Sequence, residues 1–302
     1  MTSTAAPSVL SPDASKGIAL ILASTLVFGV QDAITKHLAQ DLAVTQIVLV
    51  RFTAFAIFVL LLVARRPGGV RRAATAKRPW LQILRSLILV FEIGLFAYAI
   101  RTLALADIHA ILAVFPLVAT ALSVPLLGER VGLRRWSAVL IGFLGVLVIL
   151  RPGLGVFDVN ALLALACAFL YGLYNVLTRL VSTDGDSGQT TLFYTAIVGW
   201  VAVIAIGPWF WTWPSAELWF WLGCLSVTGI TGHWMLIKSL EAAPASVLQP
   251  FNYALLVWAT VIGFLIFGSL PDFWTVIGAS IVVGSGLYTI FRERRLKRLN
   301  RV

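Results

Sequence analysis

Long apolar segments alternate with short polar or basic loops along the whole of this 302-residue chain. An α-helix needs about 20 predominantly apolar residues to cross the hydrocarbon core of a bilayer, and most of these segments are that long. The pattern predicts ten membrane-spanning helices, at residues 17–36, 44–64, 80–100, 107–127, 135–150, 160–180, 190–211, 217–238, 245–268 and 273–291. Hydrophobic residues make up 60% of the chain and charged residues 12%, which excludes a soluble domain. We therefore expect an all-α integral membrane protein.

The chain repeats itself at an offset of 143 residues. Residues Phe28–Lys36 fall on Tyr171–Arg179, so that glycine matches glycine, threonine matches threonine, and an aromatic residue precedes the glycine in both copies. Both copies lie in long apolar segments, which is typical of a duplicated membrane unit. Because each unit holds five spans, an odd number, the second unit enters the membrane from the opposite side. We predict two inverted five-helix repeats, at residues 17–150 and 151–291.

The lysines and arginines predict the orientation of the chain, because cytoplasmic loops carry an excess of them. Nineteen of the 23 bases fall on one side of the ten-span arrangement, and they are Lys16, Arg65, Arg66, Arg71, Arg72, Lys77, Arg78, Arg85, Arg130, Arg134, Arg135, Arg179, Lys238, Arg292, Arg294, Arg295, Lys297, Arg298 and Arg301. Lys36, Arg101 and Arg151 fall on the other side, and Arg51 lies inside span two. Both termini are therefore expected in the cytoplasm.

The two ends of the chain differ in composition. Residues 1–16 are rich in Ser, Thr, Pro and Ala, and we expect them to be disordered in the cytoplasm. Residues 292–302 hold six of the bases and are expected to form a cytoplasmic tail, which either lies on anionic lipid or only sets the topology. The formal net charge of +10 does not indicate nucleic-acid binding, because no domain is present to carry it.

Several short motifs stand out in the two units. They are Phe28-Gly29 and Tyr171-Gly172, the polar Asp32 and Asn175 three positions on, the run Ala110–Pro116 leading to Leu127-Gly128-Glu129-Arg130, the fifth-span Gly142 and Gly145, and, in the second copy, Pro244–Val247, Pro250 and Phe267-Gly268. Over residues 17–290, these motifs resemble the ten-span, EamA-type branch of the drug/metabolite transporter superfamily. The second copy departs from that pattern at Ser269, where the family usually has a glutamate.

The resemblance implies a multi-pass secondary transporter of the bacterial inner membrane. Such a protein exports small metabolites by alternating access through a central cavity near the midplane of the membrane. The many tryptophans and the basic inner loops resemble most the bacterial exporters of aromatic and other neutral amino acids. Export of another drug or metabolite is the alternative, followed by a channel-like or structural membrane protein. Proton coupling and facilitated diffusion are both left open by the residues.

Four ionisable residues lie inside predicted spans, namely Asp32, Arg51, Arg85 and Glu92. Polar groups that face lipid are costly, so such residues mark the interior of a membrane protein. Arg85 and Glu92 share one helical face two turns apart, which favours either an ion pair or a role of Glu92 in handling substrate or protons. Asp32 is expected to line the cavity or to bond between helices. Arg51 either faces the interior or reaches the membrane interface.

Pro116 and Pro250 lie inside spans four and nine, and each removes a hydrogen bond from its helix. We expect both helices to kink there toward the cavity. Gln249, Asn252 and Tyr253 surround Pro250 with hydrogen-bonding side chains at membrane depth. This cluster is the best candidate for substrate binding, with helix packing as the alternative reading.

Four further residues complete the predicted site. Asn175 is the repeat mate of Asp32 and supplies a neutral polar group, while His233 lies in a glycine-rich stretch of span eight. Tyr98 and Trp234 offer aromatic walls for a flat substrate. His109, in contrast, is expected at the membrane interface.

The sequence also indicates which classes of protein are excluded. It has no phosphate-binding loop, nucleophile elbow or acid–base pair, so we expect no enzymatic activity. No His, Cys or carboxylate spacing suits a metal ion, and no cofactor is expected. Cys167 and Cys224 lie inside spans as packing residues. The expected partners are a small-molecule substrate and the lipid bilayer, and the chain is expected to be a monomer or a weak dimer.

Overall fold

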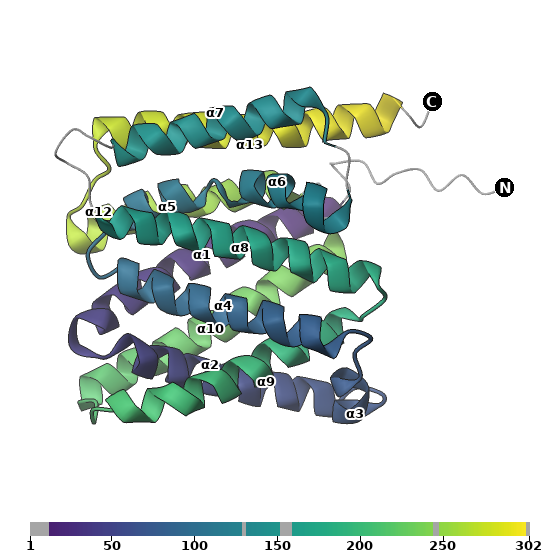
Figure 1. The fold of residues 1–302 in the computed structure, drawn as a ribbon. Helices are drawn as coiled ribbons and strands as arrows, with labels where there is room; N and C mark the ends of the chain where they lie inside the picture. The colour runs from purple at the N-terminus through teal and green to yellow at the C-terminus, as the bar shows by residue number, and fades with distance from the viewer. Residues whose placement is uncertain (1–11, 129–130, 152–158, 244–247, 300–302) are drawn as a thin grey trace.

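The computed structural model describes residues 12–128, 131–151, 159–243 and 248–299. Every regular element in these ranges is helical. In chain order they are α1 (Pro12–Asp41), α2 (Val44–Ala64), α3 (Gly69–Ala74), α4 (Pro79–Ala99), α5 (Leu105–Leu112), α6 (Phe115–Leu127), α7 (Leu133–Leu150), α8 (Val159–Thr183), α9 (Gly188–Ile206), the 3₁₀ helix η1 (Gly207–Phe210), α10 (Ala216–Ala242), the 3₁₀ helix η2 (Gln249–Tyr253), α12 (Ala254–Phe267) and α13 (Phe273–Leu299). Figure 1 shows them stacked in layers, with α7 and α13 at one edge and α2 and α9 at the opposite edge.

Eight helical segments in the described ranges are long and apolar enough to cross a membrane. Two shorter apolar helices, Trp136–Leu150 and Phe273–Thr289, lie where the fifth and tenth spans are predicted. Each of the ten predicted spans is therefore matched by helix. The all-α membrane architecture that the apolar pattern predicts is confirmed.

Some boundaries differ from the predicted ones. α1 begins at Pro12, so residues 12–16 are helical where disorder is expected, whereas residues 1–11 lie outside the described residues. α13 continues through most of the predicted basic tail. The fourth span is divided into α5 and α6, with the break just before Pro116, and η2, which contains Pro250, precedes α12. Proline lacks an N–H group and suits the first turn of a helix, so the helices restart at these two residues.

The two repeats pack against each other in matched pairs (Figure 1). α1, the first span of its repeat, packs on α10, the third span of the other, and α8 packs on α4 in the same way. α1 also contacts α12, and α8 contacts α6, which again joins a first span to a fourth. The second spans α2 and α9 pack on each other, as do the fifth spans α7 and α13. Each of these contacts therefore has its repeat-related mate, as expected of an inverted repeat.

The glycines of the repeated motif lie at two of these matched contacts. A Cβ atom at Gly29 of α1 would lie 3.1 Å from the side chain of Ile262 in α12. A Cβ atom at Gly172 of α8 would lie 2.9 Å from Val118 in α6. Both glycines let a first span approach the fourth span of the other repeat, which is how small residues act in membrane helices. The motif is thus explained by packing.

The fourth span of each repeat ends in the same conformation. Gly128 follows α6 with φ 67°, and Gly268 follows α12 with φ 63°. Both values lie in the left-handed region that glycine adopts without steric cost, so glycine ends both helices.

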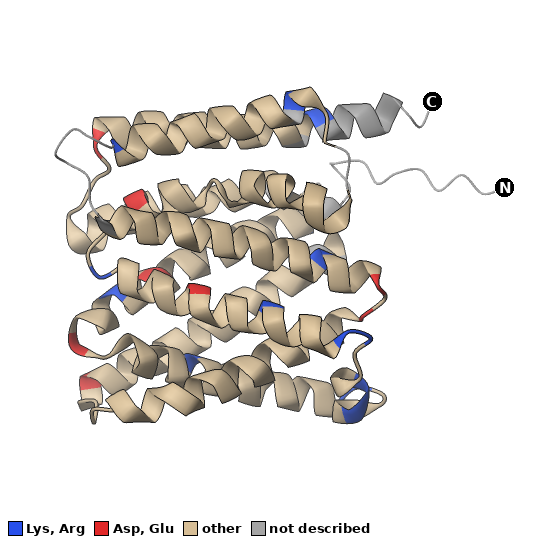
Figure 2. Cartoon of the chain, viewed as in Figure 1, with Lys and Arg blue, Asp and Glu red and all other residues tan. Residues whose placement is uncertain are grey.

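Lysine and arginine residues gather mostly at one end of the bundle, around α3 and the beginning of α7 (Figure 2). At that end the side chain of Arg78 lies 3.1 Å from the carboxylate of Asp184. At the opposite end the ammonium group of Lys36 donates hydrogen bonds to the carbonyl oxygens of Ile100 and Leu103, at 2.8 and 2.6 Å. These polar contacts tie the helix ends together at both faces of the bundle.

Candidate substrate cavity

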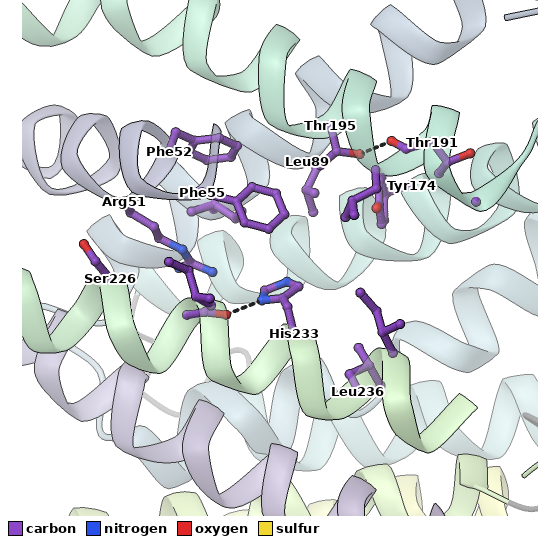
Figure 3. A pocket seen from close by; sticks show the side chains of 16 residues that line it. Arg51, Phe52, Phe55, Leu89, Tyr174, Thr191, Thr195, Ser226, His233 and Leu236 are labelled. Carbon is purple, nitrogen blue, oxygen red and sulfur yellow. Dashed lines mark hydrogen bonds between the residues drawn. The ribbon is translucent and has the colours of Figure 1, made fainter. Parts of the chain in front are cut away.

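A cavity of about 320 Å³ lies between the two repeats (Figure 3). Its lining residues are Arg51, Phe52, Phe55, Leu89, Ile93, Tyr174, Gly188, Thr191, Leu192, Thr195, Ser226, Gly229, Ile230, His233, Leu236 and Ile237. α2 and α4 of the first repeat form one side, and α8, α9 and α10 of the second form the other. The cavity extends from the middle of α10 toward the start of α9. Pockets for small ligands span roughly 300–1,000 Å³, so this one suits a small metabolite.

The cavity wall is mainly apolar, with aromatic rings and a few hydroxyl groups. Phe55 and Tyr174 present rings from opposite repeats. The hydroxyl groups of Thr195 and Ser226 each donate to a carbonyl oxygen one turn earlier in their own helix, at 2.9 Å. This back-bonding satisfies both hydroxyl hydrogens. The oxygen of Ser226 is left able to accept a hydrogen bond from a bound molecule, whereas the oxygen of Thr195 already accepts one from Arg85. The wall can therefore hold a ring by contact and orient a polar group beside it.

Arg51 is the one permanent cation among the described lining residues. Its side chain is half-buried, and the described residues provide its guanidinium group with no hydrogen bond or salt bridge. It interacts electrostatically with two carboxylates, Asp32 and Glu92. Figure 3 shows Arg51 pointing into the same space as Phe55 and His233. A guanidinium group in this position presents unused hydrogen-bond donors to the cavity.

His233 enters the cavity from α10. Its Nδ1 atom lies 2.8 Å from the carbonyl oxygen of Gly229, and because a carbonyl can only accept, Nδ1 is the donor. Its ring contacts the rings of Phe28 and Phe55, with centroids 5.1 and 5.4 Å apart. The backbone bond and the two rings fix the orientation of the imidazole, whose Nε2 atom is left for other contacts.

Asp32 and Glu92 lie beside the cavity and not in its wall. Asp32 is 8% exposed and Glu92 is 6% exposed. The carboxylate of Asp32 lies 3.0 Å from Nε2 of His109, which joins α1 to α5. The interfacial position expected for His109 is wrong, because this residue is 5% exposed and paired with Asp32. Both carboxylates interact electrostatically with Arg51, which does line the cavity, and so they influence the charge of its wall.

Arg85 does not form the ion pair with Glu92 that the helical spacing allows. Its guanidinium group is fully buried and donates to Oε1 of Gln82 at 2.7 Å and to Oγ1 of Thr178 at 3.1 Å. It also donates to the carbonyl oxygen of Thr191 and to Oγ1 of Thr195, both at 2.6 Å. These bonds tie α4 of the first repeat to α8 and α9 of the second. Arg85 therefore supports the cavity wall from behind.

The other predicted site residues do not line the cavity. Tyr98 and Trp234 are 53% and 48% exposed, and neither is among the residues that form the aromatic wall of this cavity. The amide of Asn175 donates to the carbonyl oxygen of Tyr171 in its own helix, at 2.6 Å. The described side chains of the predicted cluster around Pro250, which are those of Asn252 and Tyr253, are also outside the cavity wall.

That cluster lies against α13. A Cβ atom at Gly286 of α13 would overlap the hydroxyl oxygen of Tyr253, so this ring packs directly against the backbone of α13. Asn252 has a polar or electrostatic contact of its own and is not part of the cavity wall. The side chain of Gln249 lies outside the described residues. The substrate role of this cluster stays a prediction.

Sequence reasoning missed several residues of the cavity wall. Phe52 and Phe55 carry no distinguishing signal, because the chain has 18 phenylalanines and most spans contain some. Thr191, Thr195 and Ser226 are small hydroxyl residues in apolar helices, and the spacing of the first two on one helical face is a signal that could have indicated them. In the part of the chain that is described, no group of three or more His, Cys, Asp or Glu residues is placed to hold a metal ion.

Two helical repeats packed around a ligand-sized cavity at membrane depth define a membrane carrier. The EamA-like transporter family model matches residues 15–151 and again residues 159–291, once in each repeat. The chain belongs to this family. It is therefore a bacterial-type multi-pass membrane transporter and not an enzyme, in agreement with the expectation from the sequence.

Relatives of known name span nearly the whole chain. An S-adenosylmethionine uptake transporter of Rickettsia prowazekii is 27% identical over 282 residues, covering 92% of this chain and 94% of that protein. A riboflavin transporter of Vibrio cholerae is 28% identical over 290 residues, covering 95% and 96%. A protein of known crystal structure matches with a TM-score of 0.59 and 19% identity, over 93% of this chain and 99% of that one, which supports the fold alone. These names do not support the amino-acid exporter branch.

Proposed function

We propose that the chain is a secondary carrier for a small metabolite that combines a flat ring with a carboxylate group. The observation that carries this proposal is Arg51, a cationic group with unused donors in the wall of an otherwise mainly apolar, partly aromatic cavity. A carboxylate accepts two parallel hydrogen bonds from a guanidinium group, which is the strongest arrangement available to it. The rings of Phe55 and Tyr174 provide faces and edges for a flat ring beside it.

The relatives narrow the choice of solute. Their names give S-adenosylmethionine and riboflavin, and both compounds contain a flat heteroaromatic ring. S-adenosylmethionine also has an α-amino acid end with a carboxylate, whereas riboflavin has none. S-adenosylmethionine is therefore the first candidate for the solute. Aromatic amino acids, which also combine a ring with a carboxylate, are the second. The direction of transport is part of the proposal to be measured, because the family resemblance implies export and one relative is named for uptake.

The membrane orientation belongs to the same proposal. We expect the basic end of the bundle, around α3, to face the cytoplasm of the inner membrane, because bases are retained on that side. The cavity extends toward the start of α9 and the end of α10, on the predicted cytoplasmic side. A reporter enzyme active only in the periplasm should be inactive when it is fused after Arg78.

Counterflow in proteoliposomes tests the proposal. Vesicles that contain purified protein and unlabelled S-adenosylmethionine should accumulate the labelled compound transiently and saturably, which a channel does not do. Riboflavin, phenylalanine and tryptophan are each added in excess, and the inhibition of labelled S-adenosylmethionine accumulation ranks them as competing solutes. Absence of counterflow with every member of this panel would contradict the proposed solute class.

Substitution of Arg51 tests the carboxylate contact itself. In wild-type vesicles, phenylalanine should compete with labelled S-adenosylmethionine better than phenylalanine amide, which lacks the carboxylate. In Arg51→Gln that preference should disappear, and counterflow should fall. The control Arg101→Gln removes an exposed arginine outside the cavity and should keep the preference. If Arg51→Gln discriminates as the wild type does, Arg51 does not bind the carboxylate.

A further inference from the structure

Four ionisable side chains from four helices of the first repeat meet beside the cavity. Asp32 of α1 pairs with His109 of α5, at 3.0 Å. Arg51 of α2 interacts electrostatically with Asp32 and with Glu92 of α4. The two carboxylates also repel each other. We call these four residues the acid cluster.

The charges of the acid cluster do not balance without a proton. Arginine is always protonated, so Arg51 supplies one fixed positive charge against two carboxylates. A buried charge without compensation is costly in a low-dielectric interior, and Asp32, Glu92 and His109 are all less than a tenth exposed. Neutrality of the acid cluster as a whole therefore requires one bound proton.

Glu92 differs from Asp32 in its surroundings. Among the described residues its carboxylate has no hydrogen bond and no salt bridge within 4.0 Å, so the field of Arg51 is its main compensation. Arg51 is also the group that faces the solute. A carboxylate bound to Arg51 weakens the hold of that arginine on Glu92 and adds negative charge nearby. Both effects favour the transfer of a proton from water to Glu92.

We infer that Glu92 is a proton-binding group coupled to the cavity through Arg51, so that solute and proton occupy the carrier together and move in the same direction. This inference rests on the proposed function. The step is a simple protonation: a proton from bulk water bonds to a carboxylate oxygen of Glu92 and leaves it when the solute leaves Arg51. No other bond forms or breaks.

Several other titratable groups surround Glu92. Those around it are Asp32 of α1, Arg51 of α2, His109 of α5, Cys167 and Tyr171 of α8 and, through Arg51, His233 of α10, while Arg85 and the exposed Tyr98 share its helix α4. Arg85 is fixed by bonds to Gln82 and three threonines, as described above. The thiol and the phenol are neutral in their ordinary states. Glu92 is therefore the group that we assign to exchange a proton with water.

Transport driven by a pH gradient tests the inference. Proteoliposomes with the membrane potential held at zero by potassium and valinomycin should accumulate labelled S-adenosylmethionine when the outside is made acidic. Accumulation of each variant is divided by its counterflow at equal pH on both sides, which corrects for the amount of active protein. In Glu92→Gln this ratio should be no higher with the pH gradient than without it. Glu92→Asp should recover part of the response. The control Glu217→Gln removes an exposed carboxylate in the first turn of α10 and should respond as the wild type does.

A second measurement observes the proton directly. In weakly buffered detergent solution with a pH indicator dye, S-adenosylmethionine added to wild-type protein should raise the pH, and neither Glu92→Gln nor Arg51→Gln should do so. Counterflow without any response to the gradient, accumulation under the opposite gradient, or wild-type behaviour of Glu92→Gln would each overturn the coupling. Absence of counterflow in the wild type contradicts instead the proposed function, and the inference falls with it.

Discussion

The first repeat has Asp32 where the second has Asn175, and the middle parts of the described spans of the two repeats differ in the same sense. Arg51, Arg85 and Glu92 lie in the spans of the first repeat. The described interior of the second repeat contributes hydroxyl groups, aromatic rings and the single imidazole of His233. One repeat therefore holds charge, and the other offers neutral partners to it.

The backbone positions show the opposite behaviour. Gly29 and Gly172 occupy corresponding places and make equivalent close approaches to a fourth span. Gly128 and Gly268 end the fourth spans with nearly the same φ. Packing between inverted repeats constrains both copies equally, whereas a site between them needs only one set of charges. Duplication has thus kept the scaffold and let the interior chemistry diverge.

The largest expected effect is a loss of stability on substitution of Arg85, whose hydrogen bonds join the first repeat to the second. Arg85→Gln should lower the free energy of unfolding by about 3–5 kcal/mol, because it leaves several buried partners in α8 and α9 without their donor. Thermal unfolding in detergent measures the change. Arg66→Gln, at an exposed arginine, is the control. Equal melting temperatures for the two variants would show that the charged half does not depend on its neutral partners.

An intermediate effect is expected where the repeats are alike. Gly29→Val and Gly172→Val should each cost about 1–3 kcal/mol of stability, because the added atoms overpack a helix contact. Gly94→Val, where a Cβ atom meets nothing within 4 Å, should change stability little. Thermal unfolding of the three variants gives the comparison. A loss at only one of the two motif glycines would mean that the matched contacts are not equivalent.

The smallest effect is expected at the link between the fifth spans, where Arg151 after α7 pairs with Asp272 before α13. Burial raises the pKa of Asp272, but the Thr275 backbone N–H and hydroxyl and the Arg151 guanidinium outweigh it, so the pKa lies below its ordinary value. A lowered pKa means that the stabilisation is present above the ordinary carboxyl value and is lost as the pH falls through the lowered one.

The side chain of Asp272 is 46% exposed, so we expect its pairing with Arg151 to add only about 0.2–1 kcal/mol to the free energy of unfolding. Asp272→Asn should therefore melt slightly below the wild type at neutral pH. The gap should close below about pH 4, and a gap that persists in acid would contradict the assignment.

The fold could be predicted from the sequence because the length of an apolar segment and an internal offset are both visible in one dimension. The cavity could be predicted only in part. Asp32, Glu92 and His233 stand out as polar residues in apolar spans, and all three lie in or beside it. Tyr98 and Trp234 do not, because sequence spacing does not show which face of a helix meets the other repeat.

The central claim is that the solute binds between the repeats, in contact with both. Phe55→Cys on the first repeat and Ser226→Cys on the second place a thiol in opposite walls of the cavity. The background is Cys224→Ala, with the fully buried Cys167 retained. Ser137→Cys, exposed at the start of α7, is the control.

The measurement is the rate of labelling by a water-soluble thiol reagent with and without S-adenosylmethionine. Our account predicts that the solute slows labelling at both cavity positions and leaves the control unchanged. Protection of one wall alone, or of neither, in protein that still shows counterflow would contradict a site between the repeats.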